Sequence, residues 1–221
     1  MGGPPPQCSA NNPYEVEEQR SRLVIGFGIG SLNSTLRFAG SEDVDLELRT
    51  ASLSGSWQLN NKLSLRGGLG LILDGDLTDS NDFIQNVQPG GVISAGFEYQ
   101  ATLGEGYTPS LDFSLFLSGS ATEVENPDDM SKTSYTSSDL RLGGRASWNI
   151  KNKLFPFASA RFFGGPVNWT LNGKDVTGSD IHHYQLAAGA AMQFGNVGTF
   201  FEYAGIGEKA MSLGVSYAWQ H

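Results

Sequence analysis

Apolar residues alternate with small or polar residues along most of the chain from about residue 20 onward. Within 92–103 the odd-numbered positions are Ile, Ala, Phe, Tyr, Ala and Leu, and the even-numbered positions are Val, Ser, Gly, Glu, Gln and Thr. A period of two is typical of β-strands that have one apolar and one polar face. The same alternation recurs over 63–73, 140–150 and 182–194. The sequence therefore predicts an all-β protein.

The connections between these segments alternate in length. Tight breaks occur at 60–62, 104–106, 151–153 and 195–196, and longer polar segments occupy 32–43, 74–90, 122–137 and 167–180, with a short fifth at 205–209. The predicted strands cover 20–31, 44–59, 62–73, 91–103, 108–121, 138–150, 154–166, 181–194, 197–204 and 210–219. Short turns at one end and longer loops at the other are typical of outer-membrane barrels. We therefore expect a closed, antiparallel, up-and-down transmembrane β-barrel of ten strands, with eight as the alternative if the first or the ninth segment is not a strand.

One predicted strand changes phase. In 44–59, Leu46 and Leu48 are even-numbered, whereas Leu53 and Trp57 are odd-numbered. A β-bulge, which inserts one extra residue into a strand, would bring all four onto one face. We therefore predict a bulge near Arg49–Thr50.

The last predicted strand carries a more specific pattern. Ser212 and Gly214 fall on its polar face, Tyr217 and Trp219 fall on its apolar face, and only two residues follow. This spacing resembles the C-terminal insertion signal of bacterial outer-membrane β-barrel proteins. The resemblance implies the outer membrane of a Gram-negative cell as the location and the barrel-assembly machinery as a partner.

Composition agrees with a membrane barrel. Charged residues make up 17% of the 221 residues, Gly is abundant at 29, and no apolar run is long enough for a membrane-spanning helix. The net charge of −9 argues against nucleic acid as a partner, and the single cysteine, Cys8, excludes an internal disulfide. The chain has no apolar signal segment, so we expect that a signal peptide has been removed. Residues 1–19 are expected to be a flexible periplasmic tail that could dock an envelope partner, and 20–221 the barrel.

Large aromatic residues recur at one end of the predicted strands. Trp57, Trp148, Phe194 and Trp219 each lie near a tight turn or the terminus. Aromatic rings with a polar edge prefer the membrane interface. We interpret these four as an aromatic girdle in contact with outer-membrane lipid and lipopolysaccharide.

The polar faces of the predicted strands carry charges of both signs. These positions are Arg66, Glu98, Asp112, Arg141, Arg145, Arg161 and Glu202. Unpaired charges in a narrow lumen are costly. We therefore expect a salt-bridged, largely closed lumen with at most a narrow conductance.

Two loop motifs suggest chemistry. Asp74-Gly75-Asp76 and Asp180-Ile181-His182 resemble the catalytic pairs of the omptins, ten-stranded outer-membrane proteases in which a carboxylate-polarised His activates water. The resemblance implies catalytic roles for Asp74, Asp76, Asp180 and His182, although strand parity places His182 on the lipid side with Tyr184. A hydrolase with His and Ser on its outer wall is a related alternative. The acidic run containing Asp74, Asp76, Asp79 and Asp82 lacks the EF-hand pattern, so we expect no metal site and no cofactor.

These observations leave three functions open. The favoured one is a structural or surface-interaction barrel, or a narrow channel. The alternatives are an omptin-like protease or other barrel hydrolase, and a subunit of an envelope assembly that docks through residues 1–19.

Overall fold

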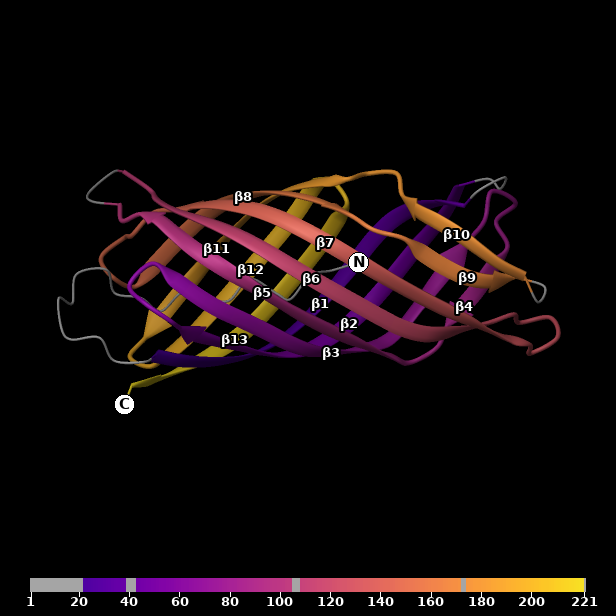
Figure 1. The fold of residues 1–221 in the computed structure, drawn as a ribbon, viewed down its shortest axis with the longest axis horizontal. Helices are drawn as coiled ribbons and strands as arrows, with labels where there is room; N and C mark the ends of the chain where they lie inside the picture. The colour runs from indigo at the N-terminus through magenta and orange to yellow at the C-terminus, as the bar shows by residue number, and fades with distance from the viewer. Residues whose placement is uncertain (1–21, 39–42, 105–107, 172–173, 221) are drawn as a thin grey trace.

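The computed structural model describes residues 22–38, 43–104, 108–171 and 174–220, so the predicted tail at 1–19 lies outside the described residues. The described residues form one antiparallel sheet that curves into an elongated barrel (Figure 1). They include no helix that could cross a membrane. The thirteen strands are β1 (Arg22–Phe38), β2 (Asp43–Gln58), β3 (Leu63–Thr78), β4 (Ile84–Val87), β5 (Gly90–Thr102), β6 (Ser110–Glu125), β7 (Lys132–Ser147), β8 (Leu154–Gly164), β9 (Val167–Leu171), β10 (Lys174–Asp180), β11 (Tyr184–Phe194), β12 (Val197–Gly207) and β13 (Lys209–Gln220).

The barrel consists of two stacked rings with different numbers of strands. In the part that contains the C-terminal end of β13, the pairings run β1–β2–β3–β5–β6–β7–β8–β11–β12–β13 and return to β1. We call this ten-stranded part the lower ring. At the opposite end the pairings run β1–β2–β3–β4–β6–β7–β9–β10 and again return to β1. We call this eight-stranded part the upper ring.

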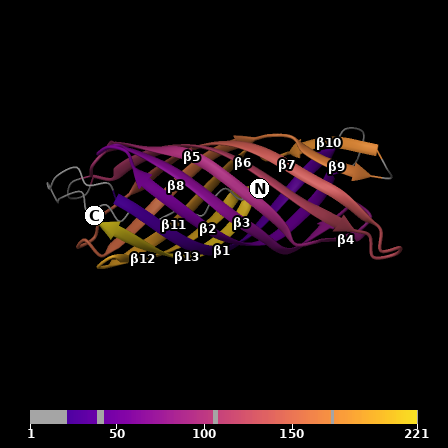
Figure 2. The same ribbon diagram turned by 60° about the horizontal axis from the view of Figure 1, so that its bottom comes forward.

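Strands of unequal length produce the change from ten to eight. The β12–β13 hairpin turns at Glu208, and β11 begins only at Tyr184, so these strands reach no further than the lower ring. The β9–β10 hairpin continues the wall above them, and β4 takes the place of β5 (Figures 1 and 2). The prediction of a ten-stranded antiparallel barrel is confirmed for the lower ring. The alternative of eight strands rested on losing the first or ninth segment, and this premise is wrong because both are strands.

The predicted long loops are largely folded. β1 extends to Phe38, β6 extends to Glu125, and β7 begins at Lys132. The strands β4, β9 and β10 lie entirely within predicted loops. The prediction that 32–43, 74–90, 122–137 and 167–180 are polar loops is therefore wrong for most of these residues, because they continue the barrel wall.

The two rings have opposite polarity. In the lower half of β1 the outward side chains are apolar and exposed, and in its upper half the inward side chains are apolar and buried. The outward positions change from Leu23, Ile25, Phe27 and Ile29 to Ser31, Asn33, Thr35 and Arg37, whereas the upper inward positions include Leu32, Leu36 and Phe38. The lower ring is thus apolar outside, and the upper ring is apolar inside.

This inversion explains the phase change in β2. Leu46 faces inward and is 1% exposed, whereas Leu53 faces outward and is 54% exposed, so β2 keeps one parity throughout. The sheet does contain a bulge at the predicted position, because Arg49 pairs with Asp74 and Thr50 pairs with Ile72. The extra residue, however, is Leu73 of β3. The predicted location is confirmed, and the interpretation that β2 itself changes phase is wrong.

The exposed apolar surface of the lower ring is continuous around the wall. It includes Ile93, Leu117 and Phe162, each more than 60% exposed. An apolar belt of this extent is not stable in water, and a closed barrel is one of the few structures that satisfies its backbone in lipid. The lower ring therefore spans a membrane, and the upper ring projects from it.

Candidate functional site: the filled barrel interior

The seven charged residues predicted for the lumen all lie on inward-facing positions of the lower ring. They come from β3, β5, β6, β7, β8 and β12, and their side chains are buried or nearly so. Period-two alternation puts them inside, because each follows or precedes an outward apolar residue. They are grouped into two ion-paired networks.

The first network lies between β3 and β7. Arg66 Nη2 donates to Glu98 Oε1 at 2.6 Å, and Arg145 Nη2 lies 3.6 Å from the same oxygen. Arg145 also donates from Nη2 and Nε to Asp112 Oδ2, at 3.1 and 3.3 Å. Two guanidiniums and two carboxylates therefore balance one another in this network.

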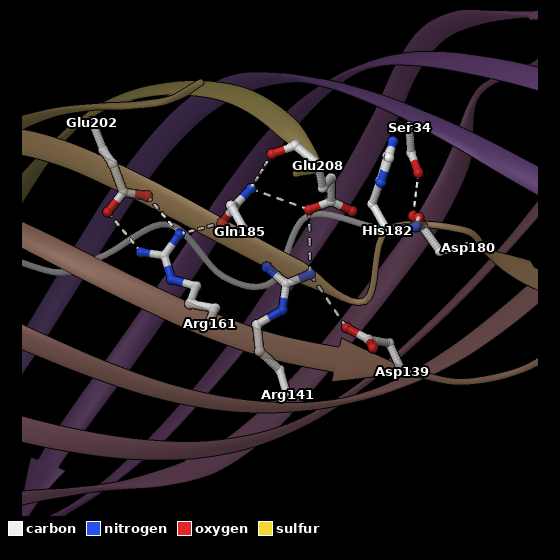
Figure 3. A network of polar contacts seen from close by, with 9 residues as sticks. All are labelled: Ser34, Asp139, Arg141, Arg161, Asp180, His182, Gln185, Glu202 and Glu208. Carbon is white, nitrogen blue, oxygen red and sulfur yellow. Dashed lines mark hydrogen bonds and ion pairs between the residues drawn. The ribbon is translucent and has the colours of Figure 1, made fainter. Parts of the chain in front are cut away.

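The second network runs along β8, β11 and β7 (Figure 3). Arg161 forms a two-pronged pair with Glu202 at 2.6 and 2.7 Å and also donates to Gln185 Oε1 at 2.7 Å. Gln185 Nε2 donates to Glu208 Oε1 at 3.2 Å. Arg141 Nη2 lies 3.6 Å from Glu208 Oε1 and donates to Asp139 at 3.3 Å. The chain of contacts thus crosses from the middle of the lower ring to its upper edge.

Aromatic rings occupy space beside these networks. The Arg141 guanidinium lies 4.7 Å from the ring centre of Phe163, and Arg145 lies 5.9 Å from that of Phe157. The Phe157 ring covers Gly189, where an added Cβ would meet it at 2.5 Å. The Phe200 ring covers Gly214 in the same way, at 2.4 Å. Glycine is needed at these positions because a Cβ would clash with the Phe rings and also with a backbone carbonyl oxygen, that of Phe201 at Gly189 and that of Phe27 at Gly214.

The interior of the upper ring is an apolar core. Its buried members are Leu32, Leu36, Phe38, Val44, Leu46, Leu48, Ile72, Leu77, Val87, Val124, Tyr135, Val167 and Trp169. The interior of an eight-stranded ring is just wide enough for side chains to fill. The polar networks of the membrane region are therefore covered by an apolar layer.

Three polar groups lie at the boundary of this core. The Tyr135 hydroxyl is buried and has no hydrogen-bond partner, and burial raises the pKa of Tyr135. The Asp180 carboxylate accepts hydrogen bonds from the Ser34 hydroxyl and from the His182 backbone amide. Burial raises the pKa of Asp180, against the opposing effect of these two donors.

The residues of the omptin-like motifs are not brought together. Asp74 lies on the outer face of the wall, where it pairs with Arg49 at 3.6 Å, and Asp76 is exposed on the same face. Asp180 faces inward, and its contact with His182 is to the backbone amide. The His182 ring lies edge-on to the ring of Tyr184, the residue with which strand parity grouped it, at 6.3 Å between ring centres. This geometry contradicts a shared catalytic site for Asp74, Asp76, Asp180 and His182.

No metal site is evident in the described part of the chain, where no three His, Cys, Asp or Glu side chains lie close enough to hold an ion. The acidic run at Asp74, Asp76, Asp79 and Asp82 is therefore not gathered into a cation site. The Asp79 carboxylate instead accepts the backbone amides of Phe83 and Asn81, which lower its pKa.

The four predicted girdle residues lie on the outer face near the lower end of the barrel. Trp57, Trp148, Phe194 and Trp219 are all exposed large apolar side chains. Trp57 and Trp219 are paired in register with the two sides of Leu23, so they flank it across β1. Of the predicted insertion signal, Ser212 and Gly214 face inward, and Tyr217 and Trp219 face outward with their rings 5.4 Å apart.

Five residues of the interior were not among the predicted site residues: Ser34, Tyr135, Asp139, Gln185 and Glu208. Asp139 and Gln185 share the parity of predicted lumen residues, so strand alternation could have included them. Glu208 lies in a turn between β12 and β13, where parity assigns no face. Ser34 and Tyr135 lie in segments predicted to be loops.

No family model and no curated protein matches the chain in sequence, but solved structures match its fold. The outer membrane protease OmpT from Escherichia coli aligns with a TM-score of 0.51 and 10% identity, over 90% of this chain and 97% of that one. The β domain of the Bordetella autotransporter BrkA aligns with a TM-score of 0.51 and 14% identity, over 91% and 100%. The translocator domain of the autotransporter NalP from Neisseria meningitidis gives 0.48 and 16%, over 93% and 90%.

The chain has the fold of a bacterial outer-membrane β-barrel. At these identities the likeness concerns the fold alone. This fold and the exposed apolar belt of the lower ring together place the chain in the bacterial outer membrane. The strands extend beyond the apolar belt at the end that forms the upper ring. In such barrels the longer segments outside the membrane face outward, so we expect the upper ring on the extracellular side.

Proposed function

We propose that the protein is a non-conducting outer-membrane barrel that acts as a structural or interaction element at the cell surface. The observation that carries this proposal is the filling of the interior at two successive levels. Two ion-paired networks occupy the membrane region, and a thirteen-residue apolar core occupies the upper ring.

Each level opposes ion passage for a different reason. Each charge of the two networks lies in an ion pair, so a passing ion would have to displace a partner and leave a buried charge uncompensated. An apolar constriction excludes water and blocks ions by dewetting. An ion that crossed the barrel would have to overcome both barriers in sequence.

The outward face of the upper ring is the surface available for interaction. It is polar and largely acidic, with Asp45 and Glu47 on β2 next to Asp74 and Asp76 on β3, and Arg49 among them. This composition suits contacts with cationic groups. Docking of an envelope partner through residues 1–19 is a separable part of the proposal, which a pull-down with and without these residues tests.

The main test is current recording in planar lipid bilayers. The folded barrel, identified by heat-modifiable migration on gels, is expected to give no stable current steps. A general porin reconstituted in the same bilayers is the positive control. Reproducible unitary conductance from the purified barrel would overturn the proposal.

A further inference from the structure

The wall of the upper ring is not equally strong on all sides. The β9–β10 hairpin is joined to β1 through Leu36–Phe38 and to β7 through Tyr135–Ser137 in the described residues. One further backbone hydrogen bond extends each seam, from Ile181 N to Thr35 O at 3.0 Å and from Ser138 N to Pro166 O at 3.1 Å. By contrast, β1 and β2 remain paired from Leu23 to Arg37, and β6 and β7 remain paired from Ser110 to Glu125. The short strand β4 has only two register pairs with β6, but four pairs with β3 hold its other side. The β9–β10 hairpin has a short seam on both sides. Local opening is easiest where few hydrogen bonds and few buried contacts must be lost.

The two short seams also bury polar groups at a cost. At the β7 seam, Tyr135 is paired in register with Trp169, and its hydroxyl has no partner. At the β1 seam, Asp180 is paired in register with Leu36, and its carboxylate is buried beside Ser34. A buried polar group that is incompletely satisfied costs free energy that water would restore. Opening either seam therefore allows water to hydrate the Tyr135 hydroxyl or the Asp180 carboxylate.

Other contacts stabilise the closed position of the hairpin. The Trp169 indole packs against Phe38, with ring centres 5.6 Å apart, and donates from Nε1 to Thr133 Oγ1 at 2.9 Å. Val167 is buried in the same apolar core. These side-chain contacts, together with the backbone pairs of the two seams, hold the hairpin closed.

We propose that the β9–β10 hairpin is a movable panel in the extracellular wall, which swings away from β1 and β7 while the remaining strands stay paired. The chain enters the panel at Gly164–Gly165–Pro166 and leaves it at Ile181–His183, and these segments are its hinges. When the panel opens, the upper ring loses its closure and its apolar core becomes accessible from outside the cell. The lower ring and its ion pairs are unaffected, so the inference goes beyond the proposed function and does not depend on it.

Hydrogen–deuterium exchange of the native protein in detergent micelles tests the panel directly. Amides of 167–171 and 174–180 are expected to exchange faster than those of 44–49 in β2, which lie in the same ring. Equal protection of the two regions would overturn the proposal.

Crosslinking provides the second test. The outward-facing register partners Arg37 and Ser179, replaced as Arg37→Cys and Ser179→Cys, place a disulfide across the β1 seam. The matched control, Asn33→Cys with Glu47→Cys, places one across the long β1–β2 seam. Oxidation of the first pair is expected to slow exchange in the panel to the level of 44–49, and oxidation of the control pair is not. Identical panel exchange in both oxidised variants contradicts a swinging panel, and if either disulfide does not form, the native comparison decides.

Quenching of Trp169 by acrylamide gives an independent readout. With Trp57, Trp148 and Trp219 each replaced by Phe, Trp169 is the remaining tryptophan of the chain. Its fluorescence is expected to be quenched in the reduced Arg37→Cys, Ser179→Cys protein and protected at least twofold after oxidation. Equal quenching before and after oxidation would count against panel motion.

Discussion

Tyr135 of β7 and Trp169 of β9 lie side by side on the inner face of the upper ring, and of their two side-chain polar atoms only the Trp169 nitrogen has a hydrogen-bond partner. The indole Nε1 donates to Thr133 Oγ1 at 2.9 Å, whereas the Tyr135 hydroxyl is buried without a partner. The pair thus combines a stabilising contact with a destabilising one at a single seam. Its two members are expected to respond oppositely to mutation.

Tyr135→Phe removes the unpaired hydroxyl and retains the ring. Leaving a buried polar group unsatisfied costs about 1–3 kcal/mol, so the variant is expected to be as stable as the native protein or more stable by about 1 kcal/mol. Trp169→Phe, the matched control, loses the bond to Thr133 and much of the packing on Phe38, and is expected to be less stable. Urea unfolding in micelles measures both. A loss of stability in Tyr135→Phe would show that the hydroxyl has a partner.

Arg145→Met tests the first ion-paired network. Arg145 contacts both Glu98 and Asp112, so its removal leaves a carboxylate under-paired in the membrane region. Breaking a buried pair on one side typically costs about 3–5 kcal/mol, and a corresponding fall in unfolding free energy is expected. Arg37→Met is the control, because the Arg37–Asp43 pair is exposed on the outer face. Similar effects from the two substitutions would show that the interior network is water-filled.

Asp180→Asn tests the pH dependence of stability. Because burial raises the pKa of Asp180 in the folded protein, the native chain binds its proton more tightly when folded. The carboxyl group therefore favours folding below its unfolded pKa of about 3.9, and this contribution is lost as the pH rises through the raised folded pKa. Asp180→Asn is expected to be more stable than the native protein at neutral pH, with the difference vanishing toward pH 4.

Asp129→Asn is the control with the opposite sign. Hydrogen bonds from Ser131 lower the pKa of Asp129, so its ionised form favours folding at neutral pH, and the variant is expected to lose stability there. Thermal unfolding of both variants across the acid range distinguishes the two cases. An Asp180→Asn protein that is less stable at neutral pH would show that the charge on Asp180 stabilises the fold.

The lower ring was predictable from the sequence because one physical rule governs it. Lipid outside and a polar lumen inside give each strand the same alternation, and parity then placed Arg66, Glu98, Arg145 and Glu202 inside. The ion-pair partners of these residues were harder to predict from the sequence. Glu208 lies in a turn, where no alternation exists, and its contact with Arg141 depends on how the β12–β13 hairpin meets β7.

The upper ring was not predictable by the same rule, because its outer face contacts water instead of lipid. Outside the membrane the outer wall faces water and the interior must be apolar, so the apolar residues change parity where the strand leaves the lipid. In β1 this change separates Ile29 from Leu32, and the polar outward residues Ser31 and Asn33 suggested a loop. A search for apolar alternation that reverses parity, with no turn residues between, would have recognised the continuing strand.

The opposite polarity of the two rings leads to the last prediction, which compares two leucines of β2. Leu46 is 1% exposed in the upper core, and Leu53 is 54% exposed on the outer face of the lower ring. Leu46→Ala creates a cavity and is expected to cost about 2–5 kcal/mol. Leu53→Ala only exchanges one lipid contact for another and is expected to cost much less. Substitution by Arg gives the second comparison, because a charge is costly in lipid and tolerated in water. Leu53→Arg places a charge in the membrane, and this costs about 2–4 kcal/mol if the site lies near the midplane. Glu47→Arg, on the outward face of the same strand above the lipid, is expected to be tolerated. Unfolding measured in lipid bilayers tests all four variants. If Glu47→Arg destabilised the barrel as much as Leu53→Arg, the lipid would extend over both rings, and the upper ring could not project into water.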